Sequence, residues 1–464
     1  MNTKSIIIVS SLILTGSYTV NAQHKNTKPN FILILADDLG WSNTSVQMDS
    51  KNPDSKSDYY YTPNIERMAE KGIRFTQAYA PAAICCPTRR SIQFGQTPVR
   101  QGEIHFKKNY HPDNNERITI PKLLKLVEPD YKTAHYGKWD LRADIFPEDL
   151  DYDESDGNTG NKDGNWGADN IEKWTNYFFS NDPKKINSLT DRAENFMKRQ
   201  VSSGNPFYLQ ISHYATHVEI QTKESTLEKY WRKDPGNIHG NPGFAAMLED
   251  LDTGIGRIID KVFELGIENN TWIILMTDNG SAELIPQTRH KMINPAEYGR
   301  PRLNYPLRGG KWTLYEGGIR VPFIVMGPDV SGGLQVETPT AGWDILPTIA
   351  DLAGYEKNFP KDIDGVSLKE ALTGNHNAKG NRPKDALFFH RYNDHYPHSA
   401  IIKGDYKLVK LWRTGDTELY NLSEDLGEVD DISKDFPEKV NELYNDLISY
   451  FKMVNAEILE KYEP

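Results

Sequence analysis

The most reactive side chains in this sequence are two adjacent cysteines. Cys85 and Cys86 are the only cysteines among 464 residues, and they begin the sequence Cys-Cys-Pro-Thr-Arg. Neighbouring cysteines can hardly form a disulfide, because the bond would be strained and would close no loop of chain. The pair therefore indicates either chemistry at a thiol or a small buried residue ahead of a proline turn.

Polar residues also stand directly after four apolar runs that we predict to be β-strands. The runs and the residues that follow them are 31–36 with Asp37-Asp38, 131–136 with Gly137-Lys138, 206–212 with His213 and His217, and 271–277 with Asp278-Asn279. In open α/β sheets, ligands lie beyond the carboxyl ends of the strands. These side chains are therefore expected to meet in one active site.

Two of these strand ends offer oxygen ligands for a metal ion. Asp37, Asp38, Asp278 and Asn279 together form the carboxylate-rich oxygen set that Ca²⁺ and Mg²⁺ prefer. Taken singly, Asp37-Asp38 could cap a helix, and Asp278-Asn279 could belong to a hairpin turn. Taken together, they predict a Ca²⁺ site, with Mg²⁺ as the second choice, whose carboxylates would repel one another without the ion.

The order of the motifs, from about Pro29 to about Leu447, resembles the type I sulfatases of the alkaline phosphatase superfamily, among them exported bacterial polysaccharide sulfatases. In that family the first cysteine of Cys-x-Pro-x-Arg is oxidised to formylglycine, an aldehyde whose hydrate is the nucleophile. The resemblance implies that Cys85 becomes formylglycine, contacts the metal ion and is oriented by Arg89. It also implies a formylglycine-generating maturation enzyme as a partner.

Three further motifs match the family and imply roles for single residues. Gly137-Lys138-Trp139 and Gly309-Gly310-Lys311 match the blocks whose lysines hold the sulfate, here Lys138 and Lys311. The stretch 213–217 matches the block whose histidine protonates the leaving oxygen, here His217. The resemblance thus implies a complete set for binding and splitting a sulfate ester.

One position departs from the family pattern. The family block reads Gly-Lys-Trp-His, with a histidine that contacts formylglycine and helps the second half of the reaction, and this chain has Asp140 there. Three alternatives stay open: Asp140 acts as a carboxylate, His135 or His105 takes the role, or the role is lost. We expect activity to be retained, because the other catalytic positions are filled.

Apolar, β-branched runs alternate with helix-like stretches, which predicts an α/β fold with a large, mixed, mostly parallel sheet sandwiched by helices. Strand-like segments at 400–409 and 418–422 and an amphipathic helix from about 437 to 452 predict a smaller C-terminal α+β subdomain with an antiparallel sheet. We expect a signal peptide at 1–22, a catalytic domain at 23–385 and this subdomain at 386–464. The Asp-, Gly- and Asn-rich stretch 148–170 is predicted to be a surface loop.

The first residues and the net charge bear on location and partners. Lys4, an apolar run at 5–14 and the small residues before Gln23 are typical of a secretory signal, and the apolar run is too short to span a bilayer. We therefore expect an exported protein, periplasmic or secreted, with no membrane anchor. The net charge of −11 argues against nucleic-acid binding.

An anionic substrate needs a local basic patch, because the chain as a whole is acidic. The basic stretch 287–311 provides the candidates Arg289, His290 and Arg308, and a solvated basic loop is the alternative. In the polar and aromatic stretch 390–398, His390 and His395 would lie at the rim of the pocket, whereas core packing explains its tyrosines equally well.

The expected function is hydrolysis of sulfate esters on a sulfated carbohydrate, for example an algal polysaccharide such as ulvan or carrageenan. Two alternatives remain, a phosphodiester or phosphonate hydrolase of the same superfamily and a non-catalytic carbohydrate-binding relative. The intact Cys-x-Pro-x-Arg motif argues against the second alternative, because a binding protein has no need of it.

Overall fold

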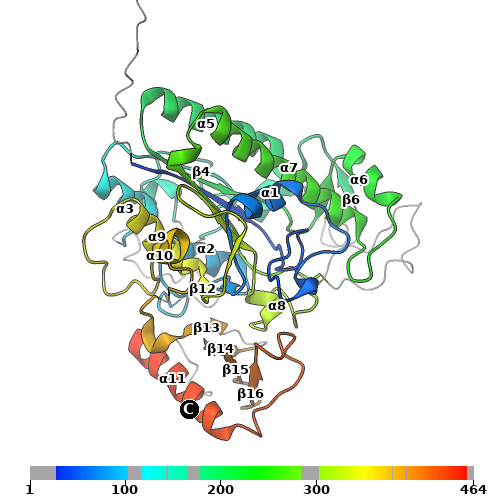
Figure 1. The fold of residues 1–464 in the computed structure, drawn as a ribbon, viewed down its shortest axis with the longest axis vertical. Helices are drawn as coiled ribbons and strands as arrows, with labels where there is room; N and C mark the ends of the chain where they lie inside the picture. The colour runs from blue at the N-terminus through cyan, green and yellow to red at the C-terminus, as the bar shows by residue number, and fades with distance from the viewer. Residues whose placement is uncertain are drawn as a thin grey trace, which may run out of the picture.

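Figure 1 shows the computed structural model of the chain, which describes residues 28–102, 117–142, 145–165, 167, 177–283, 303–378, 380–391 and 396–456. The expected signal peptide and four candidate site residues, His105, Arg289, His290 and His395, lie outside the described residues. In the described part of the chain, no helix is both long and apolar enough to cross a membrane.

The fold is built on an eight-stranded sheet. In spatial order its strands are β11 (Leu334–Val336), β2 (Ile73–Phe75), β10 (Phe323–Met326), β9 (Thr271–Thr277), β1 (Asn30–Ala36), β7 (Phe207–Ser212), β4 (Lys132–Gly137) and β5 (Glu154–Ser155). Only β10 runs antiparallel to its neighbours in this sheet. Every residue of β1, β7 and β9 is buried, as expected for parallel strands covered on both faces. The predicted mixed, mostly parallel sheet is confirmed.

Helices cover both faces of this sheet (Figure 1). Ile32 and Ile34 of β1 pack into one core, whereas Leu33 and Leu35 pack into the other, because successive side chains of a strand point to opposite faces. The first core is covered by α1 (Pro63–Lys71), α5 (Ile186–Ser203) and α7 (Pro242–Glu264). The second is covered by α2 (Cys85–Phe94), α3 (Ile120–Val127), α9 (Ile345–Leu352) and α10 (Lys369–Thr373).

A second, antiparallel sheet follows near the C-terminus. Its strands lie in the order β13 (Leu387–Arg391), β14 (His398–Lys403), β15 (Tyr406–Leu411) and β16 (Thr417–Asn421). Helix α11 (Pro437–Val454) packs on it through Leu443, Leu447 and Phe451, with the partly buried Val440 beside them, so the apolar face of the predicted amphipathic helix lies on the sheet. The predicted C-terminal antiparallel sheet with a helix is confirmed.

The remaining elements are short. They are β3 (Ala78–Tyr79) paired with β12 (Thr340–Ala341), β6 (Tyr177–Phe179) paired with β8 (Ile220–Thr222), the helices α4 (Asn161–Gly164), α6 (Glu224–Trp231) and α8 (Glu316–Ile319), and the 3-10 helices η1 (Pro53–Ser55), η3 (Pro147–Leu150), η5 (Pro183–Lys185), η6 (Glu268–Asn270), η7 (Gly342–Asp344) and η8 (Pro383–Asp385). The stretch predicted as a surface loop contains η3, β5 and α4. Its strand β5 extends the main sheet by pairing with β4, a contact between distant segments that local composition does not reveal.

A buried ion network joins the C-terminal sheet to the catalytic part of the chain. Lys407 Nζ lies 2.8 Å from both Glu316 Oε1 and Glu428 Oε1, and Arg320 Nε donates to Glu316 Oε2 at 2.6 Å. All four side chains are almost completely buried. Burial raises the pKa of Glu428 to about 7, although Lys407 opposes this shift. Lys407 is therefore the cation on which two buried carboxyl groups depend.

Replacement of Lys407 by methionine is expected to lower the free energy of unfolding by about 3 kcal/mol, because the substitution leaves Glu428 without its cation and Glu316 with Arg320 alone. Lys410→Met is the matched control on the same strand, since Lys410 Nζ bonds to the Gly415 carbonyl near the surface, and it should change stability by less than about 0.5 kcal/mol. Urea denaturation measures both values. Equal effects of the two substitutions would contradict a supporting role for the network.

Candidate active site

The site forms where the central strands end. The paired strands β1 and β9 stop at the register pair Ala36 and Thr277, so the residues that follow, Asp37 and Asp278, lie side by side. The Asp38 backbone N–H donates to Asp278 Oδ1 at 3.2 Å. Two strand ends far apart in sequence therefore bring their carboxylates to one point at the carboxyl edge of the sheet.

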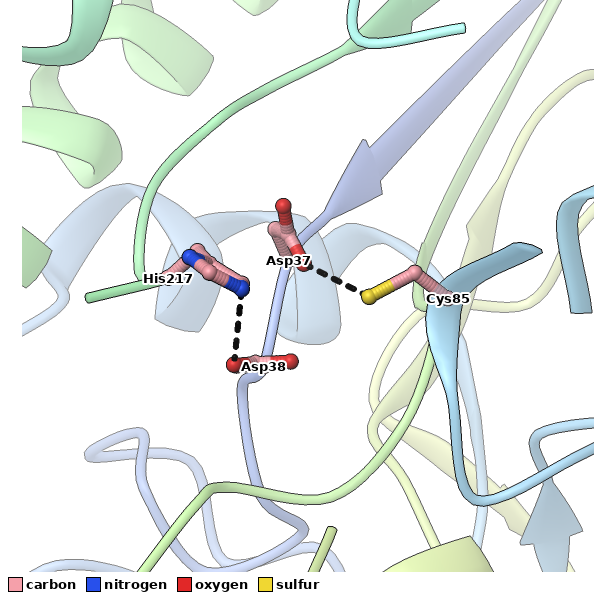
Figure 2. A group of neighbouring side chains, drawn as sticks. All are labelled: Asp37, Asp38, Cys85 and His217. Atoms are coloured by element: carbon pink, nitrogen blue, oxygen red, sulfur yellow. Dashed lines mark hydrogen bonds and ion pairs between the residues drawn. The ribbon is translucent and has the colours of Figure 1, made fainter. Parts of the chain in front are cut away.

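Cys85 faces these carboxylates from the first turn of α2. Its Sγ lies 3.7 Å from Asp37 Oδ1 and 3.5 Å from Lys311 Nζ. Figure 2 shows Cys85, Asp37, Asp38 and His217 pointing toward one another, and ligand atoms of these four lie within 4.8 Å of one another. The neighbouring Cys86 bonds through its Sγ to the Leu141 carbonyl. Of the two cysteines, Cys85 is thus the one at the carboxylates.

The unmodified thiol of Cys85 is poorly suited to act as a nucleophile. Burial, followed by the charge of Asp278, raises the pKa of the Cys85 thiol well above its usual range, although Lys138 and Lys311 oppose the shift. A thiol attacks as its thiolate, and a raised pKa leaves very little thiolate at neutral pH. The position therefore favours a chemically changed residue 85 over a free cysteine.

Each carboxylate of the site is paired with a buried cation. Lys138 Nζ lies 2.6 Å from Asp37 Oδ2, and Lys311 Nζ lies 2.7 Å from Asp38 Oδ1. Burial raises the pKa of Asp38, but Lys311 and His217 outweigh it and bring the pKa below its usual value. Asp278 also raises the pKa of Asp38, so the expected repulsion between the carboxylates is present, and the chain's own positive charges offset it.

Arg89 completes this balance by holding Asp278. From the second turn of α2, its Nε and Nη2 donate to Asp278 Oδ2 at 3.0 and 2.8 Å, and its Nη1 donates to the Lys138 carbonyl. Two donors of the guanidinium thus converge on one carboxylate oxygen and hold it in place by charge-assisted hydrogen bonds. Sequence reasoning gave Arg89 a role at residue 85 and missed its hold on Asp278, which the Cys-x-Pro-x-Arg spacing alone does not reveal.

The donor set suits a divalent cation. Asp37, Asp38 and Asp278 provide buried carboxylate oxygens, and Asn279 Oδ1 is buried with no hydrogen-bond partner among the described residues. A buried acceptor without a donor is costly unless a cation or another group satisfies it. Hard oxygen atoms of this kind prefer Ca²⁺ or Mg²⁺. These four residues therefore fit the predicted metal site.

His217 lies on the other side of the carboxylates from Cys85 (Figure 2). Its Nε2 is 3.8 Å from Asp38 Oδ2, and its Nδ1 bonds to the Val218 carbonyl, so that the proton of the neutral ring belongs on Nδ1. Burial and then Lys311 lower the pKa of His217 to about 4, while Asp38 opposes them. The ring is neutral at pH 7 and presents Nε2 to the site as an acceptor.

The segment that carries His217 is hydrogen-bonded directly to the end of β1, where the candidate metal site lies. The Thr216 backbone N–H donates to the Asp37 carbonyl at 2.6 Å, and the Asp37 N–H donates to the Ala215 carbonyl at 2.9 Å. Thr216 Oγ1 bonds to the carbonyls of Asp37 and Asp38. Sequence reasoning missed Thr216, because nothing in its local pattern distinguishes it from an ordinary loop threonine.

Asp140 is connected to the site by its contact with Lys138. Its Oδ2 lies 3.9 Å from Lys138 Nζ and is buried with no hydrogen-bond partner among the described residues, while its Oδ1 accepts from Arg142 Nε at 3.1 Å. The alternative His135 is fully buried, bonds through Nε2 to Ser212 Oγ at 3.0 Å and packs against Trp139. Of these two residues, Asp140 is therefore the one whose side chain presents an unbonded oxygen, Oδ2, to Lys138.

Two of the expected substrate-binding residues have contacts elsewhere. Arg308 Nη1 donates to Tyr420 Oη at 2.7 Å, and its guanidinium lies over the Tyr315 ring. His390 is buried against Phe451, and its Nδ1 lies 2.6 Å from Ser399 Oγ. Both side chains thus have packing contacts in and beside the C-terminal subdomain, and their binding to the substrate stays a prediction.

Comparisons with known proteins agree with this geometry. The family model described as Sulfatase matches residues 29–355, and a model described as N-sulphoglucosamine sulphohydrolase, C-terminal, matches residues 310–456. A sulfatase of Formosa agariphila is 27% identical over 93% of this chain and 88% of its own length, and mouse N-acetylgalactosamine-6-sulfatase is 28% identical over 83% and 72%. The crystal structure of Ps i-CgsB in complex with k-i-k-neocarrahexaose shares the fold, with a TM-score of 0.72 and 23% identity over 94% of both chains.

The carboxylate of Asp278 is expected to be essential for binding a divalent cation. Asp278→Ala should weaken Ca²⁺ binding by more than about 100-fold, which is the upper range for losses of residues that only support a ligand. Asp364→Ala is the matched control, because Asp364 is also a buried carboxylate held by an arginine, Arg100, at 2.7 and 2.8 Å. Isothermal titration calorimetry gives both affinities, and wild-type affinity in Asp278→Ala would refute the assigned site.

Proposed function

The chain belongs to the sulfatase family, and from this membership we propose that it hydrolyses the sulfate esters of a sulfated carbohydrate through a formylglycine made from Cys85. The enzyme class itself follows from the family: the protein is a sulfatase, a sulfuric ester hydrolase. One observation carries the proposal, the approach of Cys85 Sγ to both Asp37 and Lys311 inside the buried cluster.

Two groups supply the central chemistry. A Ca²⁺ ion, or Mg²⁺ as second choice, held by Asp37, Asp38, Asp278 and Asn279 would lower the pKa of a hydroxyl on residue 85 and neutralise charge on the sulfate. Hydrated formylglycine would provide two hydroxyls on one carbon, one to attack sulfur and one whose deprotonation restores the aldehyde and releases sulfate. Cysteine and serine lack the second hydroxyl, which explains the need for oxidation.

Lys138 and Lys311 are placed to bind the sulfate oxygens. In the structure their ammonium groups neutralise Asp37 and Asp38. A divalent ion on the same carboxylates would leave the two ammonium groups free to face the substrate anion. Positive charges fixed at the place where negative charge develops stabilise the transition state without reorganisation.

His217 is the proposed general acid. Its Nε2 points into the cluster, so a proton on Nε2 would face the ester oxygen that leaves. The pKa of His217 is lowered to about 4 by burial and Lys311, so the ring needs the negative charge of a bound sulfate ester to take up this proton at neutral pH. Because this proton transfer lets the oxygen leave as an alcohol in place of an unstable alkoxide, it lowers the barrier to breaking the ester bond.

The carbohydrate part of the proposal is supported by the relatives and by the N-terminal sequence. The mouse relative is named for sulfate on N-acetylgalactosamine, and the structural relative was captured with a carrageenan oligosaccharide. The signal-like N-terminus fits a periplasmic or secreted enzyme that acts on an external polysaccharide such as carrageenan or ulvan, after a maturation enzyme has oxidised Cys85.

A comparison of Cys85 with Cys86 tests whether the proposed chemistry occurs or the motif is a chance match. In protein produced with a maturation enzyme, peptide mass spectrometry should find formylglycine at position 85 and an intact thiol at Cys86. Cys85→Ser should lower turnover of phenyl sulfate by at least about 1000-fold, because serine cannot complete the cycle, whereas Cys86→Ser should retain turnover. Full activity with an unoxidised Cys85 would exclude the formylglycine mechanism, and faster hydrolysis of a phosphodiester than of phenyl sulfate would favour the phosphoester alternative.

Asp140 is proposed to accept the proton from residue 85 as sulfate is expelled, since an ionised carboxylate can accept and cannot donate. Asp140→Asn should then slow the second half of the reaction, so that the alcohol is released in a burst while sulfate remains on the protein, as intact-protein mass would show. Asp149→Asn is the control on an acid whose side chain bonds to the Phe146 N–H, away from the cluster. A raised KM without retained sulfate would instead assign Asp140 to substrate binding, and retained sulfate in only His135→Ala or only His105→Ala would assign the role to that histidine.

A further inference from the structure

A row of alternating charges leads from the surface into the catalytic cluster. Arg142 Nε donates to Asp140 Oδ1 at 3.1 Å, and Asp140 Oδ2 lies 3.9 Å from Lys138 Nζ. The same ammonium group lies 2.6 Å from Asp37 Oδ2. The exposed fraction of the side chain falls from 39% at Arg142 to 8% at Asp140 and to 0% at the other two residues. A single carboxylate group therefore separates the partly exposed guanidinium from the buried lysine.

The backbone at Arg142 is unusual for an arginine. Its φ is 58° and that of Asp140 is 48°, so both residues have left-handed backbones. Aspartate adopts this conformation more often than most residues, whereas arginine rarely does and glycine adopts it without strain. Strained backbones of this kind are concentrated at functional sites. The position keeps an arginine at a cost to the backbone, which indicates a role for its side chain.

Other contacts hold the backbone of residues 140–142 in place. The Asp140 N–H donates to the Thr159 carbonyl at 2.8 Å, and the Leu141 carbonyl accepts a bond from Arg90 Nε at 2.5 Å. The Leu141 side chain is buried in the second core, beneath α2 and α3. These anchors do not involve the Arg142 guanidinium, so a substitution of this side chain tests its bond to Asp140 while the backbone contacts are retained.

The bond from Arg142 restricts the carboxylate of Asp140. A carboxylate turns easily about the bond that carries it, and a held Oδ1 keeps Oδ2 directed toward Lys138. The 3.9 Å between Oδ2 and Lys138 Nζ exceeds the length of a hydrogen bond, so Oδ2 lies near the lysine without being bound to it. Without Arg142, the carboxylate could close on Lys138, which would use up both the unbonded oxygen and the ammonium group placed for the sulfate.

We propose that Arg142 is a positioning residue that holds Asp140 Oδ1, so that Oδ2 stays able to take the proton from residue 85 during sulfate release. This inference rests on the proposed function, because that proton transfer is part of it. In this step the hydroxyl on residue 85 gives its proton to Asp140, and the O–H electron pair forms the C=O bond of the aldehyde. The C–O bond to sulfate breaks, and its electron pair leaves with the sulfate. Arg142 acts through Asp140 and does not touch the reacting atoms.

Two substitutions remove the guanidinium with different effects on the backbone. Arg142→Met keeps an unbranched side chain on the left-handed backbone, whereas Arg142→Gly also relieves the strain. Arg257→Met is the matched control, because Arg257 Nε donates to a carboxylate, Glu194 Oε1, at 3.0 Å and its side chain is 35% exposed. That bond joins α7 to α5.

Rapid-quench intact-protein mass spectrometry with phenyl sulfate follows the formation and the loss of sulfated protein in the mature enzyme. Arg142→Met and Arg142→Gly should both slow the loss of sulfate by about tenfold or more, the usual effect of removing a residue that supports an active group, and leave its formation unchanged. Arg142→Met should cause no further slowing in the Asp140→Asn background, because the two residues act as one unit. Arg257→Met should change neither step.

Normal loss of sulfate in Arg142→Met overturns the inference, and so does slowing in Arg142→Met alone, which would assign the effect to the backbone. A further slowing by the same factor in the Asp140→Asn background also overturns it, because Arg142 would then act independently of Asp140. A raised KM with normal loss of sulfate would assign Arg142 to substrate binding instead. Failure of the proposed function is seen separately, as absence of phenyl sulfate turnover by the mature wild-type enzyme or as normal loss of sulfate in Asp140→Asn.

Discussion

The structure depends on a balance of three buried carboxylates and three buried cations at the carboxyl edge of the central sheet. Asp37 is paired with Lys138, Asp38 with Lys311, and Asp278 with Arg89. The six residues follow the ends of β1, β4 and β9 or lie in α2 and in the loop before α8, so the charges join distant segments. Burying any one of them alone would be strongly unfavourable, because an uncompensated charge in the interior costs several kcal/mol. These carboxylate–cation pairs stabilise the carboxyl edge of the sheet, and binding of a divalent ion and a sulfate group there would change which charges are paired.

The C-terminal subdomain supports this balance from outside. The loop that carries Lys311 receives three contacts from it: Arg391 donates to the Trp312 carbonyl, the Leu314 N–H donates to His398 Nε2, and Lys407 binds Glu316. These contacts hold one side of the cation set in place. The smaller sheet therefore acts on the active site without contributing a side chain to the cluster of Cys85, Asp37, Asp38 and His217.

The features that could be predicted from the sequence are those with a local pattern. Continuous apolar runs that end in polar residues indicated buried parallel strands and the residues at their ends, such as Asp37 and Asp278. Long-range contacts left no such pattern. The pairing of β5 with β4 and the bonds from Arg89 to Asp278 depend on which segments meet in space. Arg308 and His390 were assigned to the substrate from their charge and residue type, and the neighbours that the fold gives them were not visible in the sequence.

The central claim is that Lys138 and Lys311 would be released from Asp37 and Asp38 if these carboxylates held a divalent ion, which would couple ion binding to anion binding. Linkage requires that each ligand strengthens the other by the same factor. The most direct measurement is the affinity of inorganic sulfate for the protein with and without Ca²⁺, by calorimetry at constant ionic strength. The account predicts at least about tenfold tighter sulfate binding in the presence of Ca²⁺. Equal sulfate affinity in both states would contradict it.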